Sequence, residues 1–399
     1  MPPPPKTQFG LPTAEPEEVG LSRPALTRLS EAMGREIAAG RACGVSTLVA
    51  RHGRVAYSER FGSLRPGGPP MPDDAIFRIY SMTKPIACVA AMTLVEEGRL
   101  VLSDPVAKYL PAFAAMKVGV EHEGALELVP AKRPIAIHDL MRHTSGLTYG
   151  FTGATAVQRL VTEADIINVS KPTAQQIDRL AALPLLRQPG EAWEYGLSTD
   201  VLGHVLEVVS GKSLGDVLAE RVLRPLGMID TAFYTPPAKR DRLVEAHSYD
   251  ALKAGRIDLV EWSSPPPFEM AGSGLVSTIG DYARFLAMVA GGGALDGARV
   301  LGPRTLAYMA SDHLGPEVDR SSPFLTPGYG YGLGFAVRNE VGIAPTTGSI
   351  GEFSWGGVSG VAFWVSPRDA LFAVLMTHAP DHYPYFRQVF RNMVNAAIL

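Results

Sequence analysis

Residues 78–85 read RIYSMTKP and are followed by an apolar run from Ile86 to Met92. Proline has no N–H and clashes with the preceding turn, so Pro85 fits only in the first turn of a helix. That helix must therefore begin near Ser81. Residues three apart share a helix face, and we expect Lys84 beside Ser81 with its amine within reach of the serine hydroxyl.

A serine at a helix start also meets the unpaired backbone N–H groups and the positive end of the helix dipole. A serine nucleophile needs such donors for the oxyanion that it creates, together with a base beside it. The alternative is that Ser81 only caps the helix and Lys84 is solvated, because a Ser-x-x-Lys motif arises by chance about once in a chain of this length. The apolar run from Pro85 to Leu94 favours the catalytic interpretation, since it predicts a buried core helix with Lys84 at its N-terminal end.

Composition bounds the class of protein. The chain has 399 residues, 46% of them hydrophobic and 19% charged, which is enough for one large domain or two interleaved ones. The net charge is −3 and there is no basic block, so we expect neither nucleic acid nor an anionic membrane as a partner. The N-terminal stretch has no apolar segment typical of an export signal, and no run could span a bilayer. We therefore expect a cytoplasmic protein. The residues do not indicate its oligomeric state.

Hydrophobic periodicity predicts an α+β fold. Strand-like alternation is confined to the two ends of the chain, and helical or irregular patterns fill the middle. This order predicts an antiparallel sheet built from both chain ends and flanked by helices, with an inserted, mainly helical domain. We expect the sheet domain at 1–85 and 275–399, the helical domain at 86–274, and the active site between them. The predicted strands are 44–50, 55–60, 331–338, 353–365 and 370–377. The predicted helices include 21–39, 201–209, 281–290 and 383–397, and 157–182 is predicted to be helices or loops.

Three motifs occur in the order found in the serine β-lactamase and penicillin-binding-protein superfamily. They are Ser81-Met-Thr-Lys84, then Tyr195 in a Trp-x-Tyr turn, then Trp355-Gly-Gly on a late strand. Within the superfamily the chain most resembles the family VIII carboxylesterases, which look like class C β-lactamases but cleave esters. The resemblance covers nearly the whole chain and includes HTSG at 143–146 and GLVST at 274–278. The choice of Tyr195 among thirteen tyrosines rests on this resemblance alone.

The resemblance implies a serine β-lactamase-like fold and a Ser-Lys-Tyr mechanism without cofactor or metal. Ser81 would attack an ester carbonyl, and Lys84 and Tyr195 would share the proton transfers. The backbone N–H groups of Ser81 and Val358 would bind the oxyanion. The partner would be a small-molecule ester, and the strand residues expected to line its acyl group are Trp355, Gly356 and Gly357.

Two departures from the β-lactamase pattern favour an uncharged ester over a penicillin. Leu197 stands where the Tyr-x-Asn motif has an amide, and we place it at the substrate. Trp355-Gly-Gly stands where β-lactamases have Lys-Thr-Gly, so the lysine cation and the threonine hydroxyl of that motif are missing. A β-lactamase or D-alanyl peptidase, an acyltransferase to an alcohol, and a catalytically inactive binding module remain as alternatives. An α/β-hydrolase is disfavoured because the chain has no Gly-x-Ser-x-Gly elbow.

Aromatic residues in loops flanking the motifs predict a rim suited to a short or medium acyl chain, with core packing as the alternative for each. We place Tyr149 and Phe151 at the substrate. The histidines at 143 and 378 are expected to be structural. The spacing of His378 and His382 is metal-like, but Pro380 interrupts any helix that would align the rings, and we predict no metal site. The aromatic candidates are Tyr149, Phe151, Trp193, Trp262, Phe268, Tyr329 and Phe353.

Overall fold

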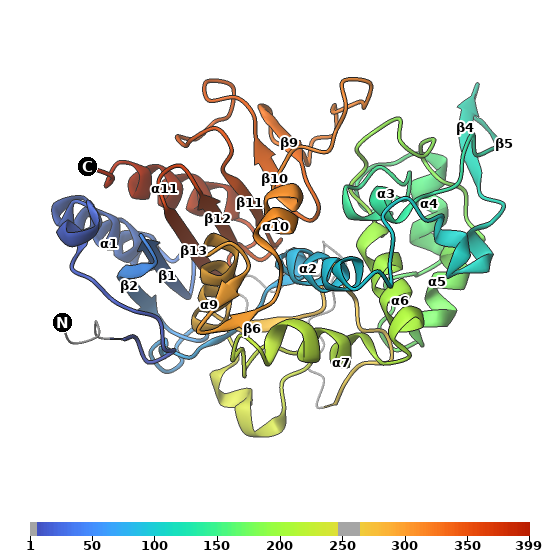
Figure 1. The fold of residues 1–399 in the computed structure, drawn as a ribbon. Coiled ribbons are helices and arrows are strands. Elements are labelled where there is room, and N and C mark those ends of the chain that lie inside the picture. The colour runs from blue at the N-terminus through green and yellow to red at the C-terminus, as the bar shows by residue number, and fades with distance from the viewer. Residues whose placement is uncertain (1–5, 246–263) are drawn as a thin grey trace.

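A computed structural model describes residues 6–245 and 264–399, so the predicted rim residue Trp262 lies outside the described part. Its centre is one antiparallel sheet of seven strands in the order β2-β1-β13-β12-β11-β10-β9. Strand β1 pairs with the last strand of the chain and β2 pairs with β1, so strands from both chain ends share one sheet, as the α+β prediction required (Figure 1). The strands are β1 (Gly44–Arg51), β2 (Arg54–Gly62), β9 (Tyr329–Tyr331), β10 (Ala336–Arg338), β11 (Phe353–Gly356), β12 (Ala362–Ser366) and β13 (Leu371–Thr377).

Helices cover both faces of the sheet because side chains alternate along each strand. On β13, Leu371, Ala373 and Leu375 pack with α1 (Arg23–Ala38) and α11 (Tyr383–Asn395). The side chains between them, such as Val374, join the larger core that contains α2 (Thr83–Glu96) and α9 (Ile279–Ala290). Figure 1 shows α1 and α11 side by side, with α9 over the other face. Because helices cover both faces of the sheet, both alternating sets of side chains on β13 are buried, and its sequence is therefore a continuous apolar run.

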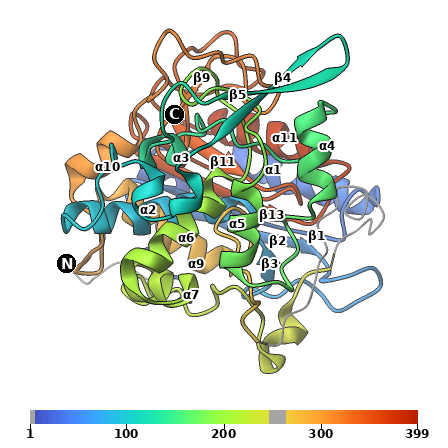
Figure 2. The same cartoon turned by 90° about the vertical axis from the view of Figure 1, so that its right-hand side faces the viewer.

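The middle of the chain is mainly helical; it lies beside the sheet in Figure 1 and in front of it in Figure 2. The segment 157–182, predicted as helices or loops, contains two helices separated by a segment that ends in Pro172. A hairpin of β4 (Lys117–His122) and β5 (Ala125–Pro130) was not predicted, and it turns at Glu123-Gly124 with positive φ at both residues. The boundaries between the two predicted domains stay a prediction. The helices here are α3 (Ile137–Met141), α4 (Ala156–Glu163), α5 (Thr173–Ala181), α6 (Ser198–Ser210) and α7 (Leu214–Leu218).

Two predicted strands prove to be hairpins. The segment 353–365 comprises β11 and β12 joined by a turn at 357–361, and 331–338 spans the end of β9 and all of β10. The turn after β11 contains Gly360 at a φ of 120°, a conformation open mainly to glycine. The prediction of one long strand was wrong because both halves are apolar, and the turn residues Val358 and Val361 continue that pattern.

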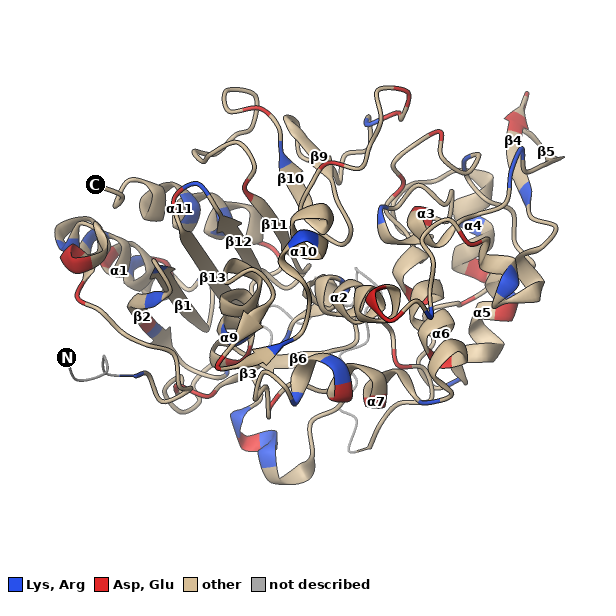
Figure 3. Cartoon of the chain, viewed as in Figure 1, with Lys and Arg blue, Asp and Glu red and all other residues tan. Residues whose placement is uncertain are grey.

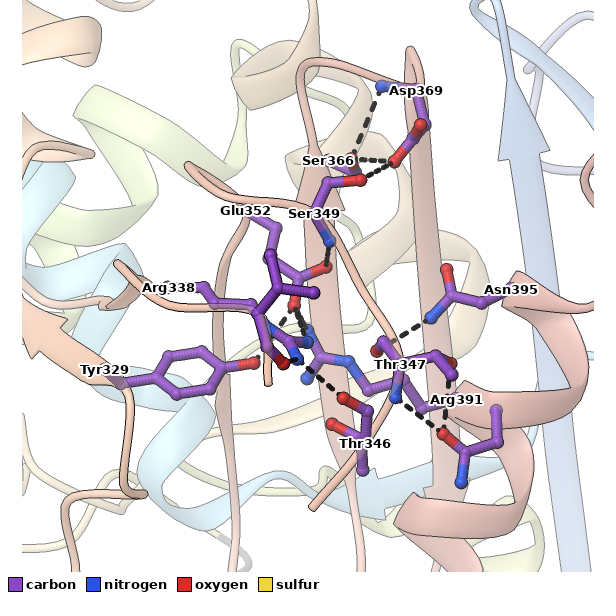
Figure 4. Close-up of polar contacts among 12 residues, drawn as sticks. Tyr329, Arg338, Thr346, Thr347, Ser349, Glu352, Ser366, Asp369, Arg391 and Asn395 are labelled. Atoms are coloured by element: carbon purple, nitrogen blue, oxygen red, sulfur yellow. Dashed lines mark hydrogen bonds and ion pairs between the residues drawn. The ribbon is translucent and has the colours of Figure 1, made fainter. Parts of the chain in front are cut away.

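A buried ion cluster fixes the segment between β10 and β11 (Figure 4). Glu352 receives hydrogen bonds from Arg338 at 2.9 Å, from Tyr329 at 3.0 Å, and from Arg391 of α11. Arg338 also donates to the carbonyl of Thr346 at 2.6 Å. The cluster therefore ties the segment 339–351 to the sheet and to the last helix.

Charged residues of both signs are spread along the chain in Figure 3, in keeping with the small net charge. Among the described residues, no helix combines the length and hydropathy needed to cross a bilayer.

Candidate active site

Ser81 lies in a single 3-10 turn, Tyr80–Met82, that leads directly into α2. The helix start predicted near Ser81 is therefore confirmed. The preceding strand, β3 (Ile76–Arg78), pairs with β6 (Val276–Thr278), and Ile79 donates its N–H to the carbonyl of Leu275 at 3.0 Å. Tyr80 has a φ of 45°, and this left-handed conformation costs a non-glycine residue roughly 1–2 kcal/mol. Strain of this kind, held by surrounding pairing, is common where a catalytic side chain must be aimed.

The structure brings the three predicted catalytic residues together. Tyr195 donates a hydrogen bond to Ser81 Oγ over 2.6 Å, and Lys84 Nζ lies 3.2 Å from the same oxygen. Lys84 is fully buried, and its Nζ also lies 4.6 Å from the centre of the Tyr195 ring. A serine hydroxyl within hydrogen-bond reach of two groups able to exchange protons has the geometry of an activated nucleophile.

Two further groups hold the amine of Lys84. It donates to the carbonyl of Gly272 at 2.7 Å and to the hydroxyl of Tyr149 at 3.3 Å. Together with Ser81 these are three acceptors, the number that an ammonium group can satisfy. Tyr149, expected only at the substrate, thus also belongs to the surroundings of Lys84.

The end of β11 packs against the nucleophile turn. A Cβ on Gly357 would lie 2.6 Å from the carbonyl oxygen of Ile79 and 3.0 Å from Tyr80 Cβ, so only glycine permits this approach. Val358 follows in the turn, rather than on a strand as expected, and lines the same cavity as Ser81. The proposed oxyanion donors, the N–H groups of Ser81 and Val358, stay a prediction.

Ser81 opens into a cavity of about 880 Å³. Of the predicted aromatic rim, Trp193 and Phe353 belong to the core instead, and Trp193 stacks on the ring of Tyr195. Leu197 is also a correction: its side chain is 0% exposed and is absent from the cavity wall, because the chain turns into α6 there and carries it into the core. The predicted residues that do line the cavity are Tyr149, Phe151, Phe268, Tyr329, Trp355, Gly356 and Gly357.

Both histidines that were expected to be structural are buried. His378 Nε2 accepts the N–H of Arg78 at 3.2 Å and its Nδ1 lies 3.1 Å from the carbonyl of Val244, so both ring nitrogens are occupied. Burial lowers the pKa of His378 to about 3 and keeps the ring neutral. His143 packs against the ring of Tyr195 at 5.1 Å, and burial together with the charge of Lys84 lowers its pKa well below the usual value.

Sequence reasoning missed Asp200 and Gly272. Asp200 lies in the first turn of α6, and its Oδ1 accepts the N–H of Gly272 at 2.9 Å. An aspartate at the start of an apolar helix is an ordinary cap signal, and Gly272 carries no side chain, so neither position stood out. The buried position of Asp200 becomes visible only in the fold.

The comparisons with known proteins agree with this geometry. The beta-lactamase family model matches residues 29–398. Protein Rv1367c of Mycobacterium tuberculosis is 36% identical, with 88% of this chain and 90% of that protein covered. Esterase EstB of Burkholderia gladioli is 31% identical over the same shares of the two chains. The solved structure of EstCE1, described as a hydrolase with promiscuous acyltransferase activity, superimposes with a TM-score of 0.77 at 27% identity, covering 93% of this chain and 98% of the other. The chain belongs to the beta-lactamase family.

Proposed function

We propose that the protein is a serine carboxylesterase that hydrolyses short- to medium-chain esters through an acyl-enzyme on Ser81, with the cytoplasm as its location. The observation that carries the proposal is the convergence of Tyr195 and Lys84 on Ser81 Oγ, at 2.6 Å and 3.2 Å. The likeness to esterase EstB over most of both chains supports ester chemistry.

The mechanism follows from these contacts. When the Lys84–Tyr195 pair holds one proton fewer than its full number, Ser81 Oγ attacks the ester carbonyl and its proton passes to the member that lacks one, while the carbonyl oxygen becomes an oxyanion. Backbone N–H donors at Ser81 and Val358 would stabilise this charge, each worth roughly 3 kcal/mol. The pair returns the proton to the departing alcohol, which leaves an ester bond between Ser81 and the acyl group. Water then attacks that ester by the reverse of the same proton path.

The cavity wall favours an uncharged, largely apolar substrate. Tyr149, Phe151 and Trp355 line the cavity into which Ser81 opens, and Trp355 takes the place at which β-lactamases carry a lysine. Apolar walls with a few aimed polar groups are typical of small-molecule sites. A volume of about 880 Å³ also leaves room for an alcohol beside the acyl group.

Acyl transfer to an alcohol is the second candidate. It uses the same acyl-enzyme, and the relative EstCE1 is described as having this promiscuous activity. Hydrolysis and acyl transfer differ only in the molecule that attacks the acyl-enzyme, which is water in the first case and an alcohol in the second.

The test is a parallel assay on p-nitrophenyl acetate, butyrate and octanoate and on the lactam nitrocefin, with Ser81→Ala as the blank. We expect fast ester cleavage that the substitution abolishes, and little lactam turnover. Adding a primary alcohol should reveal any transfer product by mass spectrometry. Lactam turnover above ester turnover would replace the esterase proposal with a β-lactamase, and no Ser81-dependent turnover would point to a binding module.

A further inference from the structure

Gly272, whose carbonyl accepts a hydrogen bond from Lys84, also contacts a buried carboxylate that the mechanism above does not use. Asp200 is 1% exposed. Its Oδ1 accepts the N–H of Gly272 at 2.9 Å, while its Oδ2 is buried and has no hydrogen-bond partner among the described residues. A buried carboxylate oxygen left unpaired is costly and calls for an explanation.

Gly272 connects this carboxylate to the lysine. Its N–H points to Asp200 and its carbonyl accepts from Lys84 at 2.7 Å, so one residue links the two side chains. A Cβ on Gly272 would lie 2.6 Å from Asp200 Oδ2 and 3.0 Å from the hydroxyl of Tyr149. Asp200, Tyr149 and Lys84 therefore gather around one glycine, and a side chain at that position would push them apart.

In the cluster formed by Asp200, Tyr149 and Lys84, the aspartate and the lysine are the two groups of opposite charge. Burial raises the pKa of Asp200 to about 6, and the ammonium of Lys84 acts in the opposite direction. Burial, followed by the charge of Asp200, raises the pKa of Tyr149 well above its usual range, so this phenol stays neutral. The other groups facing the cluster are the phenols of Tyr195 and Tyr331, which face Tyr149, and the neutral ring of His143, which faces Lys84.

We propose that Asp200 is a positioning residue of the Ser81 centre: it orients Gly272 so that its carbonyl holds Lys84, and its negative charge attracts the amine of that lysine. This inference rests on the proposed function. Attraction between unlike charges is strong where water is excluded, and the link through Gly272 fixes the geometry as well as the charge.

The test uses Asp200→Asn, which keeps the size of the side chain and an acceptor for Gly272 but removes the charge. Its matched control is Asp281→Asn. Asp281 is 5% exposed, burial raises its pKa to about 6, and it accepts the N–H of Asp230 at 2.8 Å, but its partners lie outside the Ser81 centre. The readout is the rate of labelling of Ser81 by a fluorophosphonate, followed by intact mass between pH 5 and 9, with melting temperatures of both variants.

We expect Asp200→Asn to lower the labelling rate at least tenfold and to abolish the fall in rate below about pH 6, where the wild-type carboxylate becomes protonated. Asp281→Asn should keep both the rate and the fall. An unchanged labelling rate in Asp200→Asn would overturn the inference, and so would a slower rate that still falls below about pH 6. A wild-type protein that is not labelled would overturn the proposed function itself.

If Asp200→Asn does not fold, Gly272→Ala replaces it, because this change keeps every ionisable group and only displaces them. A labelling rate at least tenfold below wild type is expected, and a wild-type rate would overturn the inference.

Discussion

The phenol of Tyr195 donates a hydrogen bond of 2.6 Å to the hydroxyl of Ser81, although 114 residues separate them in the chain. Ser81 is fixed by the start of α2, whereas Tyr195 arrives from the turn before α6. The stacking of Trp193 on the Tyr195 ring and the contact with His143 fix the direction of the phenol. The site therefore depends on the packing of the helical region against α2.

Tyr195→Phe removes only the hydroxyl that touches Ser81. Positioned proton transfer contributes a factor of about 10² to 10⁴, so we expect kcat on p-nitrophenyl butyrate to fall at least about a hundredfold. Tyr331→Phe is the matched control, because the Tyr331 hydroxyl is buried without a hydrogen-bond partner in the described structure. A rate within threefold of wild type for Tyr195→Phe would remove Tyr195 from the mechanism.

Gly357→Ala tests the close approach of β11 to the nucleophile turn. Its Cβ would meet the Ile79 carbonyl at 2.6 Å, which forces the turn that carries Val358 away from Ser81. We expect kcat to fall at least tenfold, since misplacing one oxyanion donor costs about 10² to 10³ in rate. Gly342→Ala, with open space around its Cβ, should leave kcat unchanged. Equal rates in the two variants would show that this approach has no part in catalysis.

The cluster of Glu352 with Arg338 and Arg391 should dominate the stability of its region. Glu352→Gln leaves the buried guanidinium of Arg338 without its counter-charge, and breaking a buried ion pair in this way costs about 3–5 kcal/mol. Urea unfolding should therefore show a loss of this size. Glu17→Gln, which removes half of a solvent-exposed pair with Arg23, should leave the unfolding free energy unchanged within error. Similar unfolding free energies for both variants would contradict the stabilising role of the cluster.

The buried histidine His378 should make the stability of the fold depend on pH. Its folded pKa of about 3 lies below the unfolded value of about 6.5, so the unfolded chain binds the extra proton between these values. This contribution is present above about pH 6.5 and is lost as the pH falls toward 3. The urea midpoint should fall more between pH 7 and 5 in the wild type than in His378→Asn. His52→Asn, at an exposed residue, should retain the wild-type pH dependence. An equal fall in His378→Asn would contradict this assignment.

Much of the fold could be predicted because its signals are local. Pro85 fixed the start of α2, and the alternation near both chain ends indicated a shared sheet, which the pairing of β1 with β13 confirms. The hairpin of β4 and β5 was missed because much of it is exposed and has no continuous apolar face. Strand 353–365 was misjudged because its turn is itself apolar.

The site could be predicted only where a motif marked it. Ser81 and Lys84 follow from helix spacing, and Tyr195 came from the resemblance. Leu197 was misplaced because a motif position does not say which way a side chain points, and here it points into the core. Asp200 was missed because its meaning depends on Gly272, which lies 72 residues away in the chain.

The central claim is that Ser81 carries the acyl group, and intact mass spectrometry after rapid quenching from p-nitrophenyl butyrate tests it most directly. The account predicts a mass increase of one butyryl group, located by proteolysis to the peptide containing Ser81 and absent from Ser81→Ala. Ester cleavage without a covalent adduct at any quench time, or an adduct that persists in Ser81→Ala, would contradict it.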